Sequence, residues 1–264
     1  MRLRDDVGKG RLRLLEALLP QWAKFQRKAR LRPLHYVDLL AGPGKIKFSP
    51  SGQVRRSSAL LALTAQPTFD QFWFAEPYRQ ERSALELRAR TSRLRDVVNV
   101  LTGDVAAATE KVVQAVDASE DKASYLVYID QDKLSYKWET VTALATLPAV
   151  SLMLDFSGTR FVPANTTNIM FDKAQQTKLD DFFGDGSWRS AYRPVARGSA
   201  TAVHNAMLRV YAERIATLQQ TQTQRFASGD NSKQKYSILV TSRSPFPARL
   251  WDAVMQDLRQ PRLF

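Results

Sequence analysis

Four acidic residues follow four successive apolar segments of the chain, each at the point where its segment ends. They are Asp38, Glu76, Asp104 and Asp130. Open α/β sheets bind ligands outside the carboxyl ends of their strands, so acids in these places lie where a ligand would be held. A carboxylate there can accept hydrogen bonds from an amino group, a ribose hydroxyl or an exocyclic amine. Each acid alone is also an ordinary polar residue at a strand exit, so the prediction depends on the series.

Two glycines follow the first of these segments, in the sequence "DLLAGPGK". Gly42 and Gly44 have no Cβ, so the backbone can turn sharply there and approach a ligand closely. The third glycine of a G-x-G-x-x-G motif is missing, which favours a nucleoside without a pyrophosphate. We therefore expect Asp38 to bind the amino group of such a ligand, Glu76 its ribose and Asp104 its adenine. An ordinary tight turn is the alternative.

The apolar segments alternate with helical patterns, which predicts a parallel sheet covered by helices on both faces. Two later strands separated by a Gly-Asp-Asn turn predict an antiparallel hairpin, preceded by one helix and followed by another. The fold class is therefore α/β, with a mostly parallel seven-stranded sheet that ends in a hairpin. The expected strands are 35–42, 69–76, 97–104, 123–130, 149–156, 223–227 and 235–242, and the expected helices are 58–66, 78–94, 105–116, 137–147, 201–218 and 247–260.

The N-terminal end of the chain is strongly basic. The 264 residues carry 39 Lys and Arg against 26 Asp and Glu, a net charge of +13, and much of the excess lies before residue 60. Apolar residues at helical spacing between residues 9 and 31 predict an amphipathic helix, which Pro20 should kink or split. We therefore predict a basic helical extension at 1–33 and a single domain at 34–264. A basic end suits nucleic acid, because neutralised phosphates release counterions; a solvated helix face or an acidic protein partner is the alternative.

The loop after the glycines is predicted to overhang the entrance of the site. Long loops without regular structure are often lids or substrate arms. The basic side chains of this loop would contact phosphates of a nucleic acid, and a mobile surface loop is the alternative. These side chains are Lys45, Lys47, Arg55 and Arg56.

Composition excludes several other classes of protein. There is no cysteine, so disulfides, thiolate metal sites and a cysteine nucleophile are excluded, and two histidines are too few for a histidine-based metal site. The N-terminus has no apolar run of the signal-peptide type, and no stretch reaches the ~20 apolar residues of a membrane span. We expect a soluble, cytoplasmic protein without a metal.

Seven segments spread over nearly the whole chain carry a resemblance to a known family. In order, they are "YVDLLAGPGK", "SSALLAL", "FAEP", "GD", "YLVYID", "FFGDGSW" and "YSILVTSRS". Their order and spacing resemble the three-Cys-motif partner protein family, within the class I S-adenosylmethionine-dependent methyltransferases. The resemblance implies a Rossmann-like methyltransferase fold, S-adenosylmethionine as cofactor and a cysteine-bearing partner protein. It also implies a role for each matching residue: Asp38, Ala41, Gly42 and Gly44 line the methionine end, Glu76 the ribose and Asp104 the adenine, and Asp130 faces the transferred methyl group.

The segment after Asp130 departs from the family, which usually has Asp-Pro and then a glycine where this chain has "DQDKLSY". Asp130, Gln131 and Asp132 could accept the N–H bonds of an exocyclic amine aligned for methyl transfer. Tyr136 or Trp138 could stack on an extruded base, although packing against the sheet is the favoured role. The intact acids of the first three strands favour a methyltransferase acting on or with nucleic acid. The altered segment favours a catalytically inactive module that works through its basic face in a larger complex.

Overall fold

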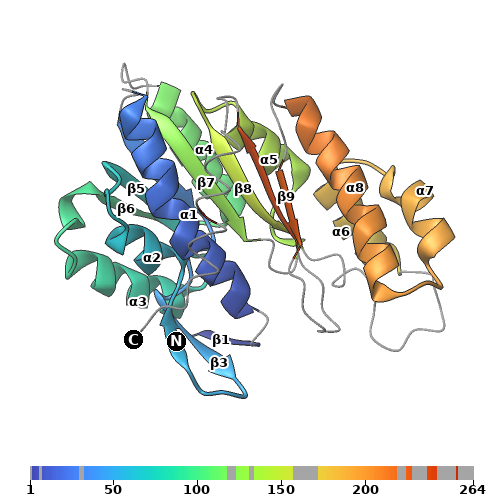
Figure 1. Ribbon diagram of the computed structural model, residues 1–264, viewed down its shortest axis with the longest axis horizontal. Coiled ribbons are helices and arrows are strands. Elements are labelled where there is room, and N and C mark those ends of the chain that lie inside the picture. Colours follow the sequence, from blue (N-terminus) through green and yellow to red (C-terminus); the bar gives the residue numbers. More distant parts are fainter. Residues whose placement is uncertain are drawn as a thin grey trace.

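The computed structural model describes residues 2–5, 8–29, 33–117, 123–130, 134–156, 172–218, 224–227, 237–242 and 254. Its centre is a seven-stranded sheet with the order β6-β5-β2-β7-β8-β10-β9 (Figure 1). The first five strands of this order are parallel, whereas β10 is antiparallel to both of its neighbours. This arrangement confirms the predicted α/β class and its terminal hairpin. The strands are β2 (Leu34–Asp38), β5 (Gln71–Ala75), β6 (Val98–Leu101), β7 (Ser124–Asp130), β8 (Ser151–Phe156), β9 (Gln224–Ala227) and β10 (Ser237–Ser242).

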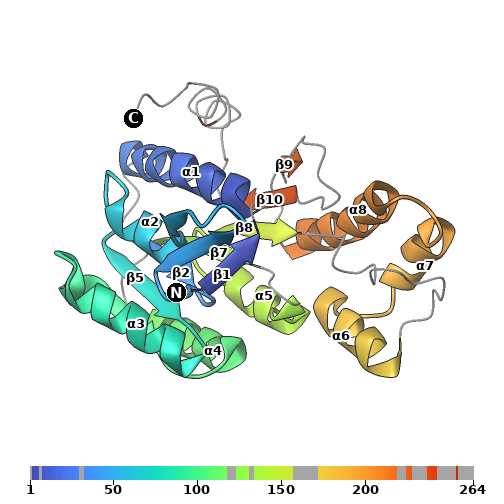
Figure 2. The ribbon, with the colours of Figure 1, turned by 90° about the horizontal axis from the view of Figure 1, so that it is seen from below.

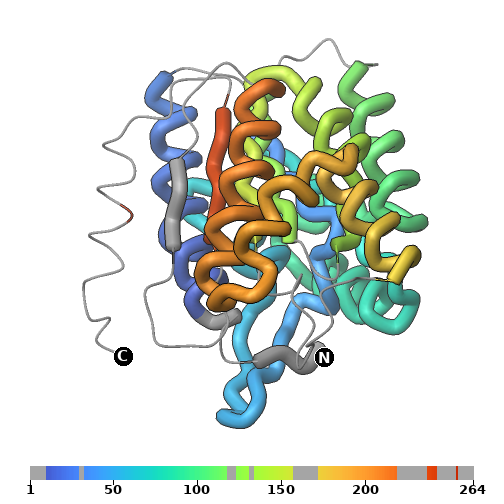
Figure 3. Tube along the Cα trace, turned by 90° about the vertical axis from the view of Figure 1, so that its right-hand side faces the viewer, coloured from blue at the N-terminus to red at the C-terminus, as the bar shows by residue number. Residues whose placement is uncertain are grey.

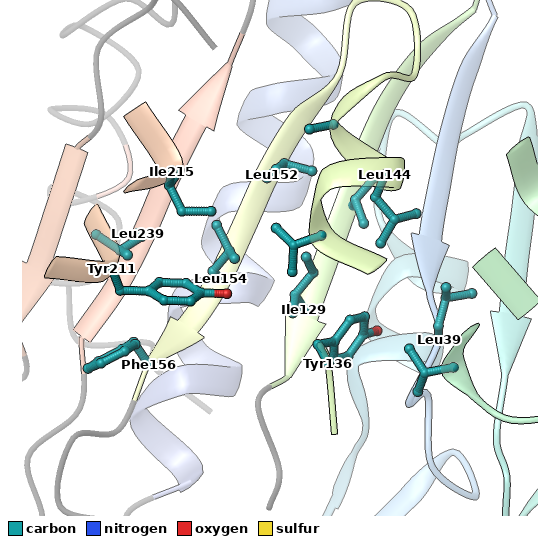
Figure 4. Packing of buried hydrophobic residues seen from close by; sticks show 14 of the residues in the cluster. Leu39, Ile129, Tyr136, Leu144, Leu152, Leu154, Phe156, Tyr211, Ile215 and Leu239 are labelled. Atoms are coloured by element: carbon teal, nitrogen blue, oxygen red, sulfur yellow. The ribbon is translucent and has the colours of Figure 1, made fainter. Parts of the chain in front are cut away.

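Helices cover both faces of this sheet, and each face has its own buried apolar cluster. On one face α1 and α2 pack over the strands, and on the other face lie α4 and α5 (Figure 2). The second cluster continues to α8 through Phe156 and Tyr211, whose rings lie 5.4 Å apart (Figure 4). The α-helices are α1 (Gly8–Lys28), α2 (Ser58–Thr64), α3 (Arg79–Arg90), α4 (Val105–Asp117), α5 (Trp138–Ala145), α6 (Lys173–Phe183), α7 (Trp188–Tyr192) and α8 (Ala200–Leu218), with 3₁₀ helices at Arg95–Val97 and Arg193–Val195.

Helix α1 runs without interruption through Pro20, so the predicted split does not occur. Leu15 and Leu18 before the proline and Trp22 after it are all fully buried. Burial of a large apolar side chain is worth about 1.5–3 kcal/mol, so three of them outweigh the ~3 kcal/mol cost of an internal proline. Trp22 also donates from Nε1 to Ser151 Oγ of β8 at 3.1 Å. The apolar face of α1 thus belongs to the same core as β2 and β5, and the proposed boundary after residue 33 stays a prediction.

A second, three-stranded sheet has the order β1-β3-β4, built from β1 (Arg2–Asp5), β3 (Lys45–Ser49) and β4 (Val54–Arg56). The prediction of an irregular loop at 45–56 is therefore wrong. In β3 the side chains of Ile46 and Phe48 are buried between exposed neighbours, which is the alternation of a half-buried strand. The β3–β4 hairpin projects from the body of the molecule, and β1 lies parallel to β3 (Figures 1 and 3).

Two helices that the sequence analysis did not predict, α6 and α7, lie between β8 and α8. Asp172 caps α6 by accepting a hydrogen bond from the Gln175 N–H at 2.8 Å. Gly184 ends α6 in the left-handed conformation, with φ of +80°. The sequence therefore contains an N-cap residue and a C-cap glycine for α6, which a prediction based on apolar segments alone does not take into account. The predicted helix at 247–260 lies outside the described residues except for Val254, which is helical and buried.

Candidate functional site

The predicted acids lie along one edge of the main sheet, because β2, β5, β6 and β7 are parallel and end there together. Asp38 and Glu76 are fully buried, and Asp130 is 6% exposed. Asp130 and Glu76 both lie near enough to Asp38 to act on its ionisation. Asp104 is exposed, after the edge strand β6. The structure therefore brings three of the four acids together and leaves the fourth at the rim.

Asp38 is a buried carboxyl group, and its hydrogen bonds offset only part of the cost of burying its charge. Its Oδ1 accepts a hydrogen bond from the Leu40 N–H at 3.2 Å. The pKa of Asp38 is raised to about 7, chiefly by burial and also by the charges of Asp130 and Glu76, although hydrogen bonds from the Ser58 hydroxyl and the Leu40 N–H act in the opposite direction. Among the described residues, the groups that act most strongly on this carboxyl include no cation. A positively charged ligand would therefore stabilise its ionised form.

Glu76 joins the turns that follow β2 and β5. One carboxylate oxygen accepts the Gly42 N–H at 3.0 Å, and the other accepts the Tyr78 N–H at 3.1 Å. The Ala41 N–H donates to the Ala75 carbonyl at 3.0 Å, so the two turns are connected twice. This carboxylate thus holds the glycine turn in place, and its predicted contact with a ribose stays a prediction.

The two glycines of the turn share one backbone requirement, and Gly44 has a second requirement of its own. Gly42 has φ of +65° and Gly44 has φ of +91°, both in the left-handed region that glycine tolerates best. A Cβ on Gly44 would lie 2.8 Å from Arg88 Cδ and 3.3 Å from Leu60 Cγ. Arg88 also donates to the Pro43 carbonyl, so α3 supports the turn from behind. The backbone conformation therefore favours glycine at both positions, and close packing against α2 and α3 is a second reason at Gly44.

A cavity of about 270 Å³ opens beside this turn. Tyr78 lies at its exposed side, with 57% of the residue accessible to solvent. Asp104 lines the cavity and at the same time accepts the Ala107 N–H at 2.9 Å, at the start of α4. Sequence reasoning found Asp104 but not the neighbours that shape the cavity with it. The lining residues are Leu40, Pro77, Tyr78, Asp104, Val105, Ala106, Ser135, Lys137 and Thr140.

On the other side of Leu40, a side chain from α1 occupies the carboxyl edge. The guanidinium of Arg11 donates to Asp155 of β8 and lies 3.8 Å from Asp130 Oδ1. Asp155 is the direct neighbour of Asp130 in the strand register, and Arg11 is 6% exposed. A space of about 20 Å³ is left beside this arginine. The lining residues are Arg11, Leu12, Leu40, Ala41, Gly42, Ile46, Ser57, Ser58, Tyr128 and Asp130.

Arg11 and Asp155 were not predicted as site residues. The signal for Asp155 is an acid inside the apolar run "SLMLDF", since a charged group is rarely buried without a partner. The other two predicted catalytic residues, Gln131 and Asp132, lie outside the described residues.

Both aromatic residues after β7 pack in the core. Tyr136 is fully buried on the same side of the sheet as Leu144 (Figure 4), and burial raises the pKa of its hydroxyl well above the usual value. Trp138 packs edge to face on Tyr211 with the ring centres 5.9 Å apart, and Arg214 lies 4.7 Å from the Trp138 ring centre. These contacts confirm the favoured role of packing.

The four basic residues predicted to contact phosphates lie on the β3–β4 hairpin, but they are not equivalent. Lys45 and Lys47 are exposed on β3. Arg56, opposite Lys45, donates to Glu16 Oε1 of α1 at 3.1 Å. Arg55 is half-buried and lies opposite Ile46. The two lysines are therefore the most available of the four.

Among the residues that the structure describes, no group of three His, Asp or Glu side chains is arranged to hold a metal ion. Among the described helices, none combines the length and the apolar character that crossing a bilayer requires.

No family model matches the sequence, and no curated protein matches it. Protein LPL1258 from Legionella pneumophila is similar in structure, with a TM-score of 0.51 at 11% identity over 93% of this chain and 90% of that chain. An O-methyltransferase from Bacillus cereus in complex with SAH gives a TM-score of 0.44 at 12% identity over 86% of this chain and 80% of that chain. The O-methyltransferase TomG from Streptomyces achromogenes in complex with SAM gives a TM-score of 0.43 at 13% identity over 86% of this chain and 79% of that chain. Identities this low concern the fold alone. The sheet order, with antiparallel β10 between β8 and β9, is that of a class I methyltransferase fold.

Proposed function

We propose that this protein is an S-adenosylmethionine-dependent methyltransferase that acts on or together with nucleic acid. The observation that carries the proposal is the cavity of about 270 Å³ at the carboxyl edge of a class I sheet, between Tyr78 and Asp104. Its volume is near the lower end of the ~300–1,000 Å³ typical of small-molecule sites. The resemblance in sequence and the structural neighbours support the same donor.

The residues at this edge suit the parts of such a donor. The exposed ring of Tyr78 and the ring of Pro77 give the cavity an apolar wall for a nucleobase, and Asp104 supplies an acceptor for an exocyclic amine. Asp38, a buried carboxyl whose pKa is raised by burial, suits the ammonium group, which would stabilise its ionised form. The bound donor would supply an electrophilic methyl group on a sulfonium. Asp130, close to Asp38, is then the residue to accept an N–H of the methyl acceptor and to hold its lone pair toward that methyl.

Calorimetry with S-adenosylhomocysteine tests the donor site. We expect micromolar binding, because the cavity has both an apolar wall and a placed acceptor. Tyr78→Ala should weaken this binding about tenfold through the lost aromatic contact. Leu87→Ala is the matched control, because Leu87 is an exposed apolar residue on α3 that does not line the cavity. Absence of heat with millimolar ligand would refute the donor site, and equal weakening by both variants would refute the role of Tyr78.

The nucleic-acid part of the proposal is supported by the charge of +13 and by the exposed lysines of the hairpin. Affinity for a single-stranded oligonucleotide should fall steeply with salt. Replacing both Lys45 and Lys47 by alanine should reduce the slope of log K against log salt by about 1.4, at about 0.7 for each lost phosphate contact. Replacing Lys173 and Lys178, two exposed lysines of α6, is the control with equal charge loss. A flat slope in the wild type would exclude this partner.

A second function has one observation in its favour. Arg11 already pairs with Asp155 and lies near Asp130, the residue expected to face the acceptor. A module that keeps the scaffold without catalysis could have such a filled site, and it would work through its basic face. Failure to transfer a methyl group from bound donor to any tested RNA, DNA or protein would favour this function. The finer resemblance to the three-Cys-motif partner family, with its cysteine-bearing partner, is likewise a proposal.

A further inference from the structure

The buried guanidinium of Arg11 lies where a methyl acceptor would have to lie. It contacts Asp155 and is 3.8 Å from Asp130, at the carboxyl ends of β7 and β8. Arginine is rarely buried to 6% exposure unless its charge is paired, and here two carboxylates from adjacent strands provide that pairing. The carboxylate assigned to the acceptor is therefore already next to a positive group of the chain itself.

The space left around Arg11 is too small for an acceptor. About 20 Å³ remains beside it, which is room for about one water molecule. The cavity on the donor side of Leu40 is about 270 Å³. Leu40 lines both spaces, so they adjoin the same residue. The donor side is thus open, whereas the acceptor side is filled by α1.

Arg11 lies near the N-terminal end of α1, before the fully buried part of its apolar face. The helix begins at Gly8, and Gly10 follows in its first turn. Glycine is a poor helix former, so the two glycines lower the cost of unwinding this first turn, which is opposed by the buried ion pair of Arg11 with Asp155. The fully buried apolar face begins only at Leu15. Local unwinding up to residue 11 would therefore withdraw the guanidinium while the rest of the helix stays packed.

We propose that Arg11 is a gate on the acceptor side of the methyl-transfer site. With its guanidinium between Asp130 and Asp155, the site admits the donor but no acceptor, and withdrawal of Arg11 opens it. The gate rests on the proposed function, because it requires the donor to bind beside Leu40. A gate would also explain why the donor side of the site is open in this structure while the acceptor side is filled.

Two ligands separate the gate from the donor site. The first is S-adenosylhomocysteine, which occupies the donor side alone. The second is a bisubstrate analogue in which the sulfur position of the donor carries a linked adenosine, which must also enter the acceptor side. Arg11→Met, which keeps an apolar stem, should bind S-adenosylhomocysteine as the wild type does and bind the bisubstrate analogue about tenfold more tightly or better. The gain arises because the wild-type affinity is reduced by the small fraction of molecules with the gate open.

Two further variants keep the test interpretable. Arg13→Met is the matched control, because Arg13 is an exposed residue of the same helix, and it should change neither affinity. If Arg11→Met alone does not fold, the pair Arg11→Met with Asp155→Asn removes both buried charges together and should show the same gain. Equal bisubstrate affinity in the wild type and the Arg11 variants would overturn the gate. So would weaker S-adenosylhomocysteine binding in those variants, since it would assign Arg11 to the donor. Absence of binding of either ligand to every protein would refute the proposed function, and the gate with it.

Discussion

Replacement of Asp38 by asparagine is expected to stabilise the protein above neutral pH and to weaken donor binding. Asp38 is fully buried, and burial raises its pKa from 3.8 to about 7. The native state therefore binds this proton more tightly than the unfolded state does. Stability must then fall as the pH rises from about 4 to about 7, and it levels off above the native pKa. Asparagine has nearly the same shape, carries no charge and keeps an oxygen for the Leu40 N–H.

The size of the effect follows from the two pKa values. A difference of about three pH units corresponds to roughly 4 kcal/mol at 1.36 kcal/mol per unit, and this is the cost of the ionised carboxyl at alkaline pH. At pH 5 only about a third of that cost is present, because pH 5 lies little more than one unit above the pKa of this carboxyl in the unfolded chain. The stability gained by Asp38→Asn should therefore grow by about 3 kcal/mol between pH 5 and pH 8.5.

Urea unfolding of the wild type and of Asp38→Asn at the two pH values measures this difference. Asp96→Asn is the control, because the Asp96 side chain is 86% exposed. At pH 8.5 the same Asp38→Asn protein should bind S-adenosylhomocysteine at least about tenfold more weakly, since the ammonium loses its ionised partner. A stability gain that is the same at pH 5 and pH 8.5 would show that Asp38 does not carry a raised pKa. Unchanged ligand affinity would remove Asp38 from the donor site.

Two further substitutions test packing and surface contacts. Gly184→Ala should cost about 2–4 kcal/mol in urea unfolding, because φ is +80° and the new Cβ would meet Trp138 at 2.4 Å, whereas Gly52→Ala, at φ of +68° in open space, should cost about 1 kcal/mol; equal costs would contradict the clash. A double-mutant cycle on Arg56 and Glu16 should give a coupling of about 0.2–1 kcal/mol, because their side chains are 47% and 26% exposed, and a coupling above about 2 kcal/mol would contradict this estimate.

The main sheet was predictable because each of its parallel strands is a local pattern. The apolar runs before Asp38, Glu76 and Asp130 are short, bounded by turn residues and too apolar for a surface. The β3–β4 hairpin was not predictable in the same way, although Lys45–Ser49 has the alternation of a strand. Its neighbour β1 lies more than forty residues earlier in the chain, and pairing across that distance leaves no local signal.

The same limit explains why half of the candidate site was missed. Arg11 is one of many basic residues on an amphipathic helix, and nothing in its neighbourhood along the chain distinguishes it from Arg13. It becomes a site residue only because folding brings it to Asp155, which is 144 positions away. The acid in an apolar strand showed that a partner was needed, but it could not show which of 39 basic residues would provide it.

The carboxylates at this edge differ in how their charge is compensated, and that difference directs where a cationic ligand goes. Glu76 accepts two backbone N–H groups, and Asp130 and Asp155 lie against Arg11. Asp38 accepts the Leu40 N–H, and burial raises its pKa to about 7 in spite of this hydrogen bond. A ligand ammonium stabilises a carboxylate most where no neighbouring group already stabilises the negative charge. It should therefore bind at Asp38 rather than at Asp130. Asp130 then needs Arg11 to leave before it can accept a proton-bearing group, so the pairing of charges alone separates the donor side from the acceptor side.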